Sequence, residues 1–514
     1  MRIVNNFNKI FIYIVLIILI ILFNLNLDPN ISFYGDNGPK FFQAYAVINN
    51  QFKDDVIRCQ WLSEFEFCKY AVKATTMYNV DEYTLRGVFP VALSYFNAII
   101  IYLLGKEYFL VIPQIIFFIN LLMFYRYLDS FFLIALFLFT PLFFQYLSFS
   151  DLALSLFFSS FVYIFLDKRD SLSKRKTFLL GTITGLNVFF RYETQIFIFV
   201  LLFLLYLMDK ENRKKYLIFS FGVLFSLLVF FIVNFIYYGN IIGIRFEANK
   251  QGIFNINVKE KLFSIWGNLW GTWTHPVGHF KYMFYLLIFY ILFFINRKKF
   301  PLLNSVIYYS ILISLMIILV LVPNDSGADF GTRYLSVLIY PSFLLINNFY
   351  KIYENKIIQY MIIFVMFIAL FFTVKFFNEL QKVNHFYRDI YLSLNDNAKK
   401  NSLWIFHSNF GSGGLGAYLI DNTAIVLEHE YEVDEFIKTF EAHSLEKKYK
   451  NLVIFHFRFN FYLPEEINQK DRYFYEDERV REKLLKFIQK KYVNSVSKKV
   501  IIKDKEDINI YYFY

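Results

Sequence analysis

The chain has 514 residues, of which 57% are hydrophobic and 18% charged, and its formal net charge at pH 7 is +11. A soluble core does not need so many apolar runs of membrane-spanning length, so this composition excludes an ordinary soluble protein and favours a polytopic α-helical membrane protein. The positive charge lies in short loops between apolar runs and not on one folded face, which argues against nucleic acid as a partner.

The first apolar run, residues 10–27, is predicted to be a retained membrane anchor. It is longer than the apolar core of a signal peptide, and no small-residue cleavage site follows it. The polar segment after it, residues 28–87, contains both cysteines of the sequence, Cys59 and Cys68. If this segment is exported, the two cysteines form either a disulfide or a pair of free thiols.

Basic clusters orient the remaining spans, because Lys and Arg in short loops stay on the cytoplasmic side. The N-terminus is predicted to be cytoplasmic, together with the loops 167–176, 209–215, 297–299 and 351–356. After the anchor, the predicted spans are 108–125, 130–140, 151–166, a hairpin over 178–208 that turns near residues 191–193, then 216–238, 281–296, 301–322, 333–350 and 357–376. This gives about eleven spans.

One apolar segment must not cross the membrane, since an odd number of spans has to separate segment 28–87 from loop 167–176. Residues 88–104 are interrupted by Ser94 and Asn97 and are predicted to form an interfacial helix. Residues 141–151 then form a short outer turn, which puts Asp151 on the outer face. In the alternative, residues 151–166 join their neighbour as a re-entrant pair and Asp151 lies inside.

The chain divides into a membrane domain, residues 1–376, with outer loops 28–107, 239–280 and 323–332, and a tail, residues 377–514. Charged residues return in the tail, which predicts a small extracytoplasmic α/β domain. Its predicted strands are 402–407, 423–427 and 452–457, its helices include 433–440 and 480–490, and a hairpin covers 500–503 and 508–513. The glycine-rich stretch 411–414 lacks both the GxGxxG order and a P-loop lysine, so it predicts a turn.

Ionisable residues at the edges of spans are costly unless they are paired or line a wet cavity, so they are candidates for a site. The substrate-binding candidates are Lys40, Arg191, Glu193, Arg245, Lys250 and Arg333. Arg191 and Glu193 could equally form a structural ion pair at the hairpin turn. The guanidinium of Arg333 suits a phosphate at headgroup depth, and the alternative is an interfacial anchor.

His275 and His279 are four residues apart, a spacing that would place both on one face of a helix and suit a metal ion. Pro276 and Gly278 oppose a helix there, and no third ligand is adjacent. Packing of this loop beside three nearby tryptophans is therefore the preferred interpretation. A divalent metal is possible but not indicated.

The stretch Gly35-Asp36-Asn37-Gly38-Pro39-Lys40-Phe41-Phe42-Gln43-Ala44 follows the first span, and Asp151 begins a later one. Together with residues 327–335 and the outer tail, this layout resembles the GT-C superfamily. Its members are polytopic glycosyltransferases that use polyprenyl-phosphate sugars, such as dolichyl- or undecaprenyl-phosphate sugars. The resemblance covers residues 1–376 in layout and a few short stretches in motif.

The resemblance implies that Asp36 is the catalytic carboxylate and that Asp151 belongs to a second acidic motif. Asn37 stands where the superfamily often has a second acid, which argues against a metal site built from that pair, and no cofactor is required. The implied reaction lies at the outer face of a bacterial inner membrane. Asp36 accepts the proton of an acceptor hydroxyl, which attacks the anomeric carbon and inverts it.

The implied partners are the polyprenyl-phosphate sugar donor, membrane lipid and an acceptor that is a lipid, a glycan or a protein. Two other functions stay open. A flippase or transporter for a lipid-linked saccharide would use the same outer cations but needs polar residues through its spans. A non-enzymatic envelope assembly protein would need the spans only as an anchor.

Overall fold

The computed structural model describes residues 13, 14, 16–18, 20, 21, 28, 37–58, 77–79, 84–109, 111–148, 150–246, 257–272, 278–322, 333–353, 355–393, 402–406, 423–427, 429–457, 470–492, 495–502 and 505–513. Contacts divide the chain into two units. Unit 1 is formed by residues 1–26, 89–93 and 109–379. Unit 2 is formed by residues 27–88, 94–108 and 380–514.

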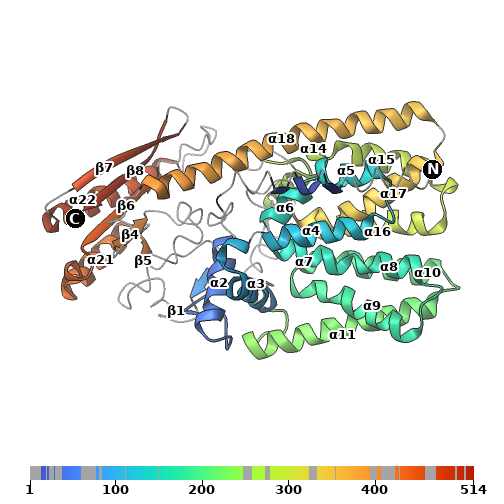
Figure 1. Cartoon of the computed structure of the whole chain (residues 1–514), viewed down its shortest axis with the longest axis horizontal. Coiled ribbons are helices and arrows are strands. Elements are labelled where there is room, and N and C mark those ends of the chain that lie inside the picture. Colours follow the sequence, from blue (N-terminus) through green and yellow to red (C-terminus); the bar gives the residue numbers. More distant parts are fainter. Residues whose placement is uncertain are drawn as a thin grey trace. The chain divides into compact units, whose positions relative to one another are not determined.

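Unit 1 is a bundle of helices (Figure 1). In chain order they are α4 (Val111–Phe124), α5 (Ser130–Leu138), α6 (Leu142–Ser148), α7 (Ser150–Ser159), α8 (Phe161–Lys168), α9 (Lys174–Gly185), α10 (Tyr192–Met208), α11 (Arg213–Tyr238), α13 (Val258–Trp270), α14 (His279–Tyr282), α15 (Phe284–Asn296), α16 (Leu302–Leu321), α17 (Ile339–Ile352) and the first part of α18 (Lys356–Ser393). The 3₁₀ helices η4 (Leu186–Phe189), η5 (Arg297–Lys299) and η6 (Arg333–Leu338) precede α10, α16 and α17. α10 packs against both α11 and α16.

Within the described part of the chain, four helical stretches are long and apolar enough to cross a membrane: Arg213–Tyr238, Leu302–Leu321, Arg333–Ile352 and Lys356–Asp389. Shorter apolar helices are Val91–Leu104, Val111–Phe124 and Tyr192–Met208. Large apolar side chains stay exposed along the long helices, for example Ile236 of α11 at 72% and Phe364 of α18 at 72%. Exposed apolar faces of this extent are typical of helices in contact with lipid, which indicates a membrane protein.

The predicted boundaries agree with the structure for the longest helical segments. They differ where a helical segment is interrupted. The predicted spans 216–238 and 301–322 coincide with α11 and α16, and the span 333–350 with η6 and α17. The predicted turn 141–151 is wrong, because Leu142–Ser148 forms helix α6. Pro141 precedes its first residue, and at this point of a helix a proline ring replaces an N–H that has no partner anyway.

Helices α9 and α11 approach each other through glycines. A Cβ atom on Gly181 of α9 would lie 2.1 Å from the carbonyl oxygen of Phe219, and one on Gly222 of α11 would lie 2.2 Å from the carbonyl oxygen of Phe178. Gly185, four residues after Gly181, is also close to α11, since a Cβ atom on it would lie 2.8 Å from the carbonyl oxygen of Val223. This spacing is the small-xxx-small pattern of close helix pairs in membranes, where backbone packing replaces the hydrophobic effect.

We expect Gly222→Leu to lower the free energy of unfolding by about 3 kcal/mol, since the atoms in the way belong to the backbone of α9 and cannot rotate aside. Thermal unfolding in detergent measures this. The matched control is Phe221→Leu on the same helix, whose ring is 61% exposed. Equal unfolding temperatures for the two variants would show that the helices do not meet at Gly222.

The described residues of unit 2 form two small sheets. In the first polar segment, α2 (Asn37–Asn49) and α3 (Val91–Leu104) flank strands β1 (Ile57–Arg58), β2 (Met77–Asn79) and β3 (Thr84–Gly87). These strands are antiparallel in the order β1-β3-β2, with Ile57 opposite Leu85 and Tyr78 opposite Arg86.

The tail forms a five-stranded sheet in the order β5-β4-β6-β8-β7. Its elements are β4 (Ser402–Phe406), β5 (Thr423–Val426), α21 (Glu430–Ala442), β6 (Asn451–Phe457), α22 (Lys470–Lys491), β7 (Ser495–Ile502) and β8 (Lys505–Phe513). β4 runs parallel to β5 and β6, while β8 is antiparallel to β6 and β7. Apolar side chains of α21 and α22 pack on the sheet as one core. The predicted strands and closing hairpin of the tail are confirmed.

Candidate functional site

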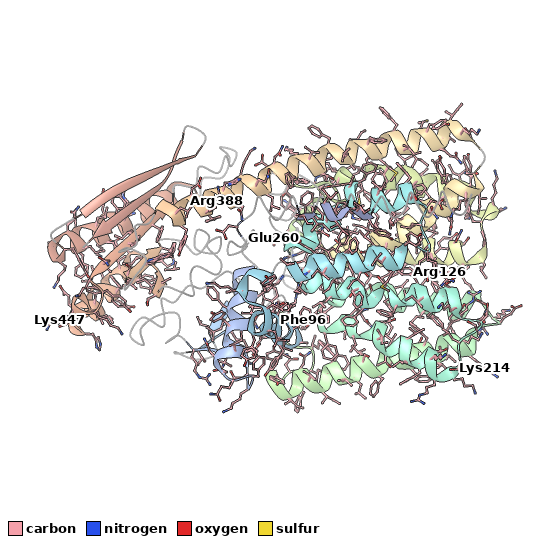
Figure 2. All side chains as sticks on the ribbon, in the orientation of Figure 1. Phe96, Arg126, Lys214, Glu260, Arg388 and Lys447 are labelled. Carbon is pink, nitrogen blue, oxygen red and sulfur yellow. The ribbon has the colours of Figure 1, made fainter. Side chains whose placement is uncertain are left out.

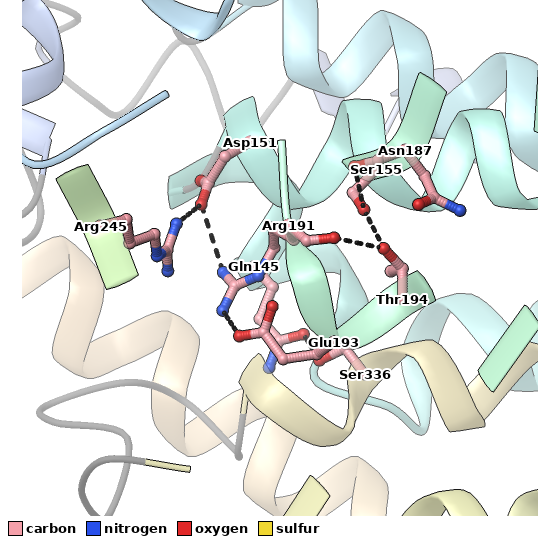
Figure 3. Close-up of polar contacts among 9 residues, drawn as sticks. All are labelled: Gln145, Asp151, Ser155, Asn187, Arg191, Glu193, Thr194, Arg245 and Ser336. Atoms are coloured by element: carbon pink, nitrogen blue, oxygen red, sulfur yellow. Dashed lines mark hydrogen bonds and ion pairs between the residues drawn. The ribbon is translucent and has the colours of Figure 1, made fainter. Parts of the chain in front are cut away.

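A buried carboxylate in unit 1, Asp151, lies between two guanidinium groups (Figure 3). It belongs to the first turn of α7, and its side chain is 1% exposed. Nη1 of Arg191 donates to Asp151 Oδ2 at 3.3 Å, and Nη1 of Arg245 lies 3.5 Å from the same oxygen. The three residues come from separate elements, so the contacts tie α7, the start of α10 and the segment after α11 together.

Arg191 is held on both of its terminal nitrogens. Nη2 donates to Oε1 of Glu193 at 3.0 Å, while Nη1 faces Asp151. The backbone carbonyl of Arg191 accepts a hydrogen bond from Thr194 Oγ1 at 2.7 Å, and this hydroxyl lies 2.7 Å from Ser155 Oγ on α7. A buried guanidinium between two carboxylates is electrostatically satisfied, so Arg191 stabilises the geometry of the cluster.

Two glycines bring Arg245 to this cluster. Gly239 ends α11 with φ +66°, and Gly243 has φ +88°, both conformations that side chains with a Cβ rarely adopt. The returning segment is fixed by Tyr192, whose hydroxyl donates to the carbonyl of Ile242 at 2.8 Å. The chain therefore doubles back from the end of α11 and directs Arg245 at Asp151.

Aromatic rings complete the cluster. The guanidinium carbon of Arg191 lies 5.7 Å from the ring centre of Tyr334, and that of Arg333 lies 5.6 Å from the same centre. Arg245 lies 5.8 Å from the ring centre of Phe89. Cations at these distances are attracted by the negative face of a ring, which compensates part of their loss of hydration.

The cluster combines fixed and available positive charge. Arg191 is fully engaged by Asp151 and Glu193, whereas Arg245 has one carboxylate contact, at 3.5 Å, among the described residues. Its remaining N–H groups form no hydrogen bond to a described residue, so they are available as donors to a ligand. Arg245 is also 8% exposed, so a ligand on it would be held in a medium with little water. This arrangement suits an anion with several acceptor oxygens.

Five of the residues predicted from the sequence meet in this cluster: Asp151, Arg191, Glu193, Arg245 and Arg333. The predicted ion pair between Arg191 and Glu193 is part of it. Asp36 and Lys250 lie outside the described residues. Lys40 lies on α2 in unit 2 and is buried there.

The sequence reasoning missed a second set of polar contacts, beneath α2 in unit 2. Nε2 of Gln43 donates to Asp55 Oδ2 at 2.9 Å, and Arg86 Nε forms an ion pair with Asp55 Oδ1 at 3.0 Å. Burial raises the pKa of Asp55, and the nearby Arg86 acts in the opposite direction. A Cβ on Gly87 would lie 2.2 Å from Oε1 of Gln43, so the Gln43 side chain packs directly on the backbone of β3. These contacts join α2 to β3.

The histidine loop is seen in part, because His275 lies outside the described residues. His279 begins α14 and is fully buried, and burial lowers its pKa to about 3, so its ring is neutral at pH 7. Among the residues that the structure describes, no group of three or more His, Cys, Asp or Glu side chains is gathered in one place. Cys59 and Cys68 are not among these residues.

The chain matches no protein-family model, and no curated protein matches it.

Proposed function

We propose that this chain is a membrane glycosyltransferase of the GT-C type. It would transfer a sugar from a polyprenyl-phosphate donor to an acceptor hydroxyl at the outer face of a bacterial inner membrane, with about eleven spans and an outer C-terminal α/β domain. The observation that carries the proposal is the buried cluster in which Asp151 orients Arg191 and Arg245, with Arg333 close by. Such a cluster suits the phosphate of a lipid carrier.

The positions of the ends of α10 and α11 support an outer location for the arginine cluster. The cluster lies at the start of α10 and just beyond the end of α11. The basic loop 209–215 lies at the other end of both helices. Since Lys- and Arg-rich loops stay in the cytoplasm, the cluster belongs at the opposite, outer face. α10 has 17 residues and is about 25 Å long, which is close to the thickness of a bilayer core.

The proposed step is a single displacement. The acceptor oxygen forms a bond to the anomeric carbon as its proton passes to the carboxylate of Asp36. The bond between that carbon and the phosphate oxygen breaks, and the electron pair leaves with the polyprenyl phosphate. Arg245 and Arg333 would hold the departing phosphate, whose negative charge grows in the transition state. Asp151 acts as a positioning residue, because two guanidiniums already occupy it.

Arg245→Ala is expected to weaken binding of undecaprenyl phosphate by about 10- to 100-fold. A hydrogen bond to a charged group contributes about 1.5–3 kcal/mol, and Asp151 retains Arg191 in this variant, so the fold should survive. Arg333→Ala is expected to act in the same direction. Titration of the purified protein in detergent with undecaprenyl phosphate measures both affinities.

The matched control is Arg126→Ala, since Arg126 is exposed and contacts Asp167 at 3.8 Å in a part of unit 1 away from the cluster (Figure 2). An affinity in Arg245→Ala equal to that of the control would remove the cluster from the phosphate site. A flippase would share this phosphate site, so binding alone does not separate it from a transferase. A transferase would need the carboxylate of Asp36 for sugar transfer, whereas a flippase would not. The effect of Asp36→Asn on transfer therefore separates the two functions.

A further inference from the structure

A second feature of unit 1 lies at the other end of the bundle from the arginine cluster. A cavity of about 440 Å³ opens between the end of α10, the loop that follows it and the start of α16. Its wall is polar on one side, with Arg169, Asp209 and Lys210, and apolar on the other, with Leu205, Leu302 and Val306. The volume is within the usual range of small-ligand sites.

The polar wall is pre-formed by hydrogen bonds. Asp209 Oδ2 accepts from the hydroxyl of Tyr216 at 2.6 Å and from Asn212 Nδ2 at 3.1 Å, and lies 3.5 Å from Arg169 Nη1. Arg169 Nη1 also donates to the Tyr216 hydroxyl at 3.0 Å. The charge of Asp209 is thus engaged, while Arg169 Nη2 and Lys210 Nζ have no bond to any described residue.

The apolar wall reaches the outside of the bundle. Leu302 at the start of α16 is 48% exposed, and Met208 at the end of α10 is 39% exposed. α16 is one of the stretches that are long and apolar enough to cross a membrane. The cavity therefore has its apolar rim at the level where such a helix would leave the lipid, with cations just beyond it.

Three loops around the cavity carry a strong positive charge. Residues 167–176, 209–215 and 297–299 contain twelve basic and four acidic residues. Glu211, on the cavity wall, is one of the acids, and its single charge is far outweighed by this excess. Positive pockets between membrane helices on the cytoplasmic side attract acidic headgroups, because that leaflet is negatively charged.

We propose that this cavity binds one acidic phospholipid. Its phosphate would lie between Arg169 Nη2 and Lys210 Nζ, and an acyl chain would run along Leu302 and Met208. The proposal assumes that α16 crosses the membrane, and it is independent of any sugar transfer. The apolar rim is the reason for choosing a lipid over a soluble anion, since a free phosphate makes no use of it.

Thermal unfolding of the full chain in detergent, titrated with phosphatidylglycerol, tests the site. A lipid that binds only the folded protein raises the unfolding temperature by mass action. We expect Lys210→Ala to raise the half-saturating concentration about fivefold, the effect of one basic residue near an acidic headgroup. Lys210 is exposed and has no described partner, so this variant should fold normally.

The matched control is Lys214→Ala, which removes the same charge from a nearby exposed position outside the cavity (Figure 2). An equal loss in both variants would indicate diffuse attraction to the basic surface and would overturn the site. So would equal stabilisation of the unaltered protein by phosphatidylcholine or by inorganic phosphate. Native mass spectrometry provides a second measurement: one retained phosphatidylglycerol in the unaltered protein, and a smaller retained fraction in Lys210→Ala but not in Lys214→Ala.

Discussion

We expect Asp36→Asn to reduce sugar transfer by about 10²- to 10⁴-fold, the usual contribution of a general base. An amide has the shape of the carboxylate but does not accept the proton of the acceptor hydroxyl. Asp36 directly precedes α2, which the contacts among Gln43, Asp55 and Arg86 join to the neighbouring sheet. The variant should therefore keep its fold and its affinity for undecaprenyl phosphate, and lose only the chemical step.

Mass spectrometry of envelope glycans from a deletion strain, complemented with each variant, measures this result. The matched control is Asp129→Asn, because Asp129 is an exposed carboxylate that pairs with Lys351 at 3.1 Å. A transferase should lose its glycan product in Asp36→Asn and keep it in Asp129→Asn. If both variants restore the same glycans to the deletion strain, the chain does not use Asp36 as a base, and a transporter or assembly protein becomes the better interpretation.

The second large effect concerns stability. Asp151→Asn is expected to lower the free energy of unfolding by about 3 kcal/mol, because it removes one partner of a buried ion cluster and leaves positive charge behind. Arg191 keeps Glu193 in this variant, but Arg245 loses its carboxylate contact. The unfolding temperature in detergent should fall, and binding of undecaprenyl phosphate should weaken because Arg245 is no longer oriented.

Asp129→Asn again provides the comparison, since it is the same substitution in an exposed pair. The side chains of Asp129 and Lys351 are 52% and 49% exposed, and such pairs contribute about 0–1 kcal/mol. An unfolding temperature for Asp151→Asn that matches this control would mean that water reaches the cluster freely. The cluster would then not be the buried anion site inferred above.

The sequence was sufficient for much of the fold because apolar length and strand-like runs are local signals. The helices Arg213–Tyr238 and Leu302–Leu321 and the strands of the tail follow from them. The interruptions of helices inside apolar segments cannot be predicted from these local signals. Residues 151–166 read as one span, yet the structure has two helices, α7 and α8, that meet at Ser160. Which polar residue inside an apolar run interrupts a helix depends on its tertiary neighbours.

Each member of the arginine cluster could be identified as a candidate from the sequence. Their proximity in the folded chain could not be predicted. Asp151 and Arg191 are 40 residues apart and Asp151 and Arg245 are 94 apart, distances over which periodicity gives no information. Tyr334 directly follows Arg333 but was not identified as a member of the cluster, because the sequence contains 40 tyrosines. Gly239 and Gly243 return the chain to Asp151 through their positive φ angles. These backbone angles cannot be predicted from the sequence.

The close glycine contact between α9 and α11 bears on how the chain is made. α9 and the 3₁₀ helix η4 follow each other without a gap and together are about 26 Å long, close to the thickness of a bilayer core. Without α11, the backbone beside Gly181 and Gly185 would lack its packing partner, so α9 depends on a helix synthesised some thirty residues later. During translation, α9 should wait at the insertion machinery until α11 emerges. A nascent chain stopped after α10 would then be a target for membrane proteases, whereas one stopped after α11 would persist.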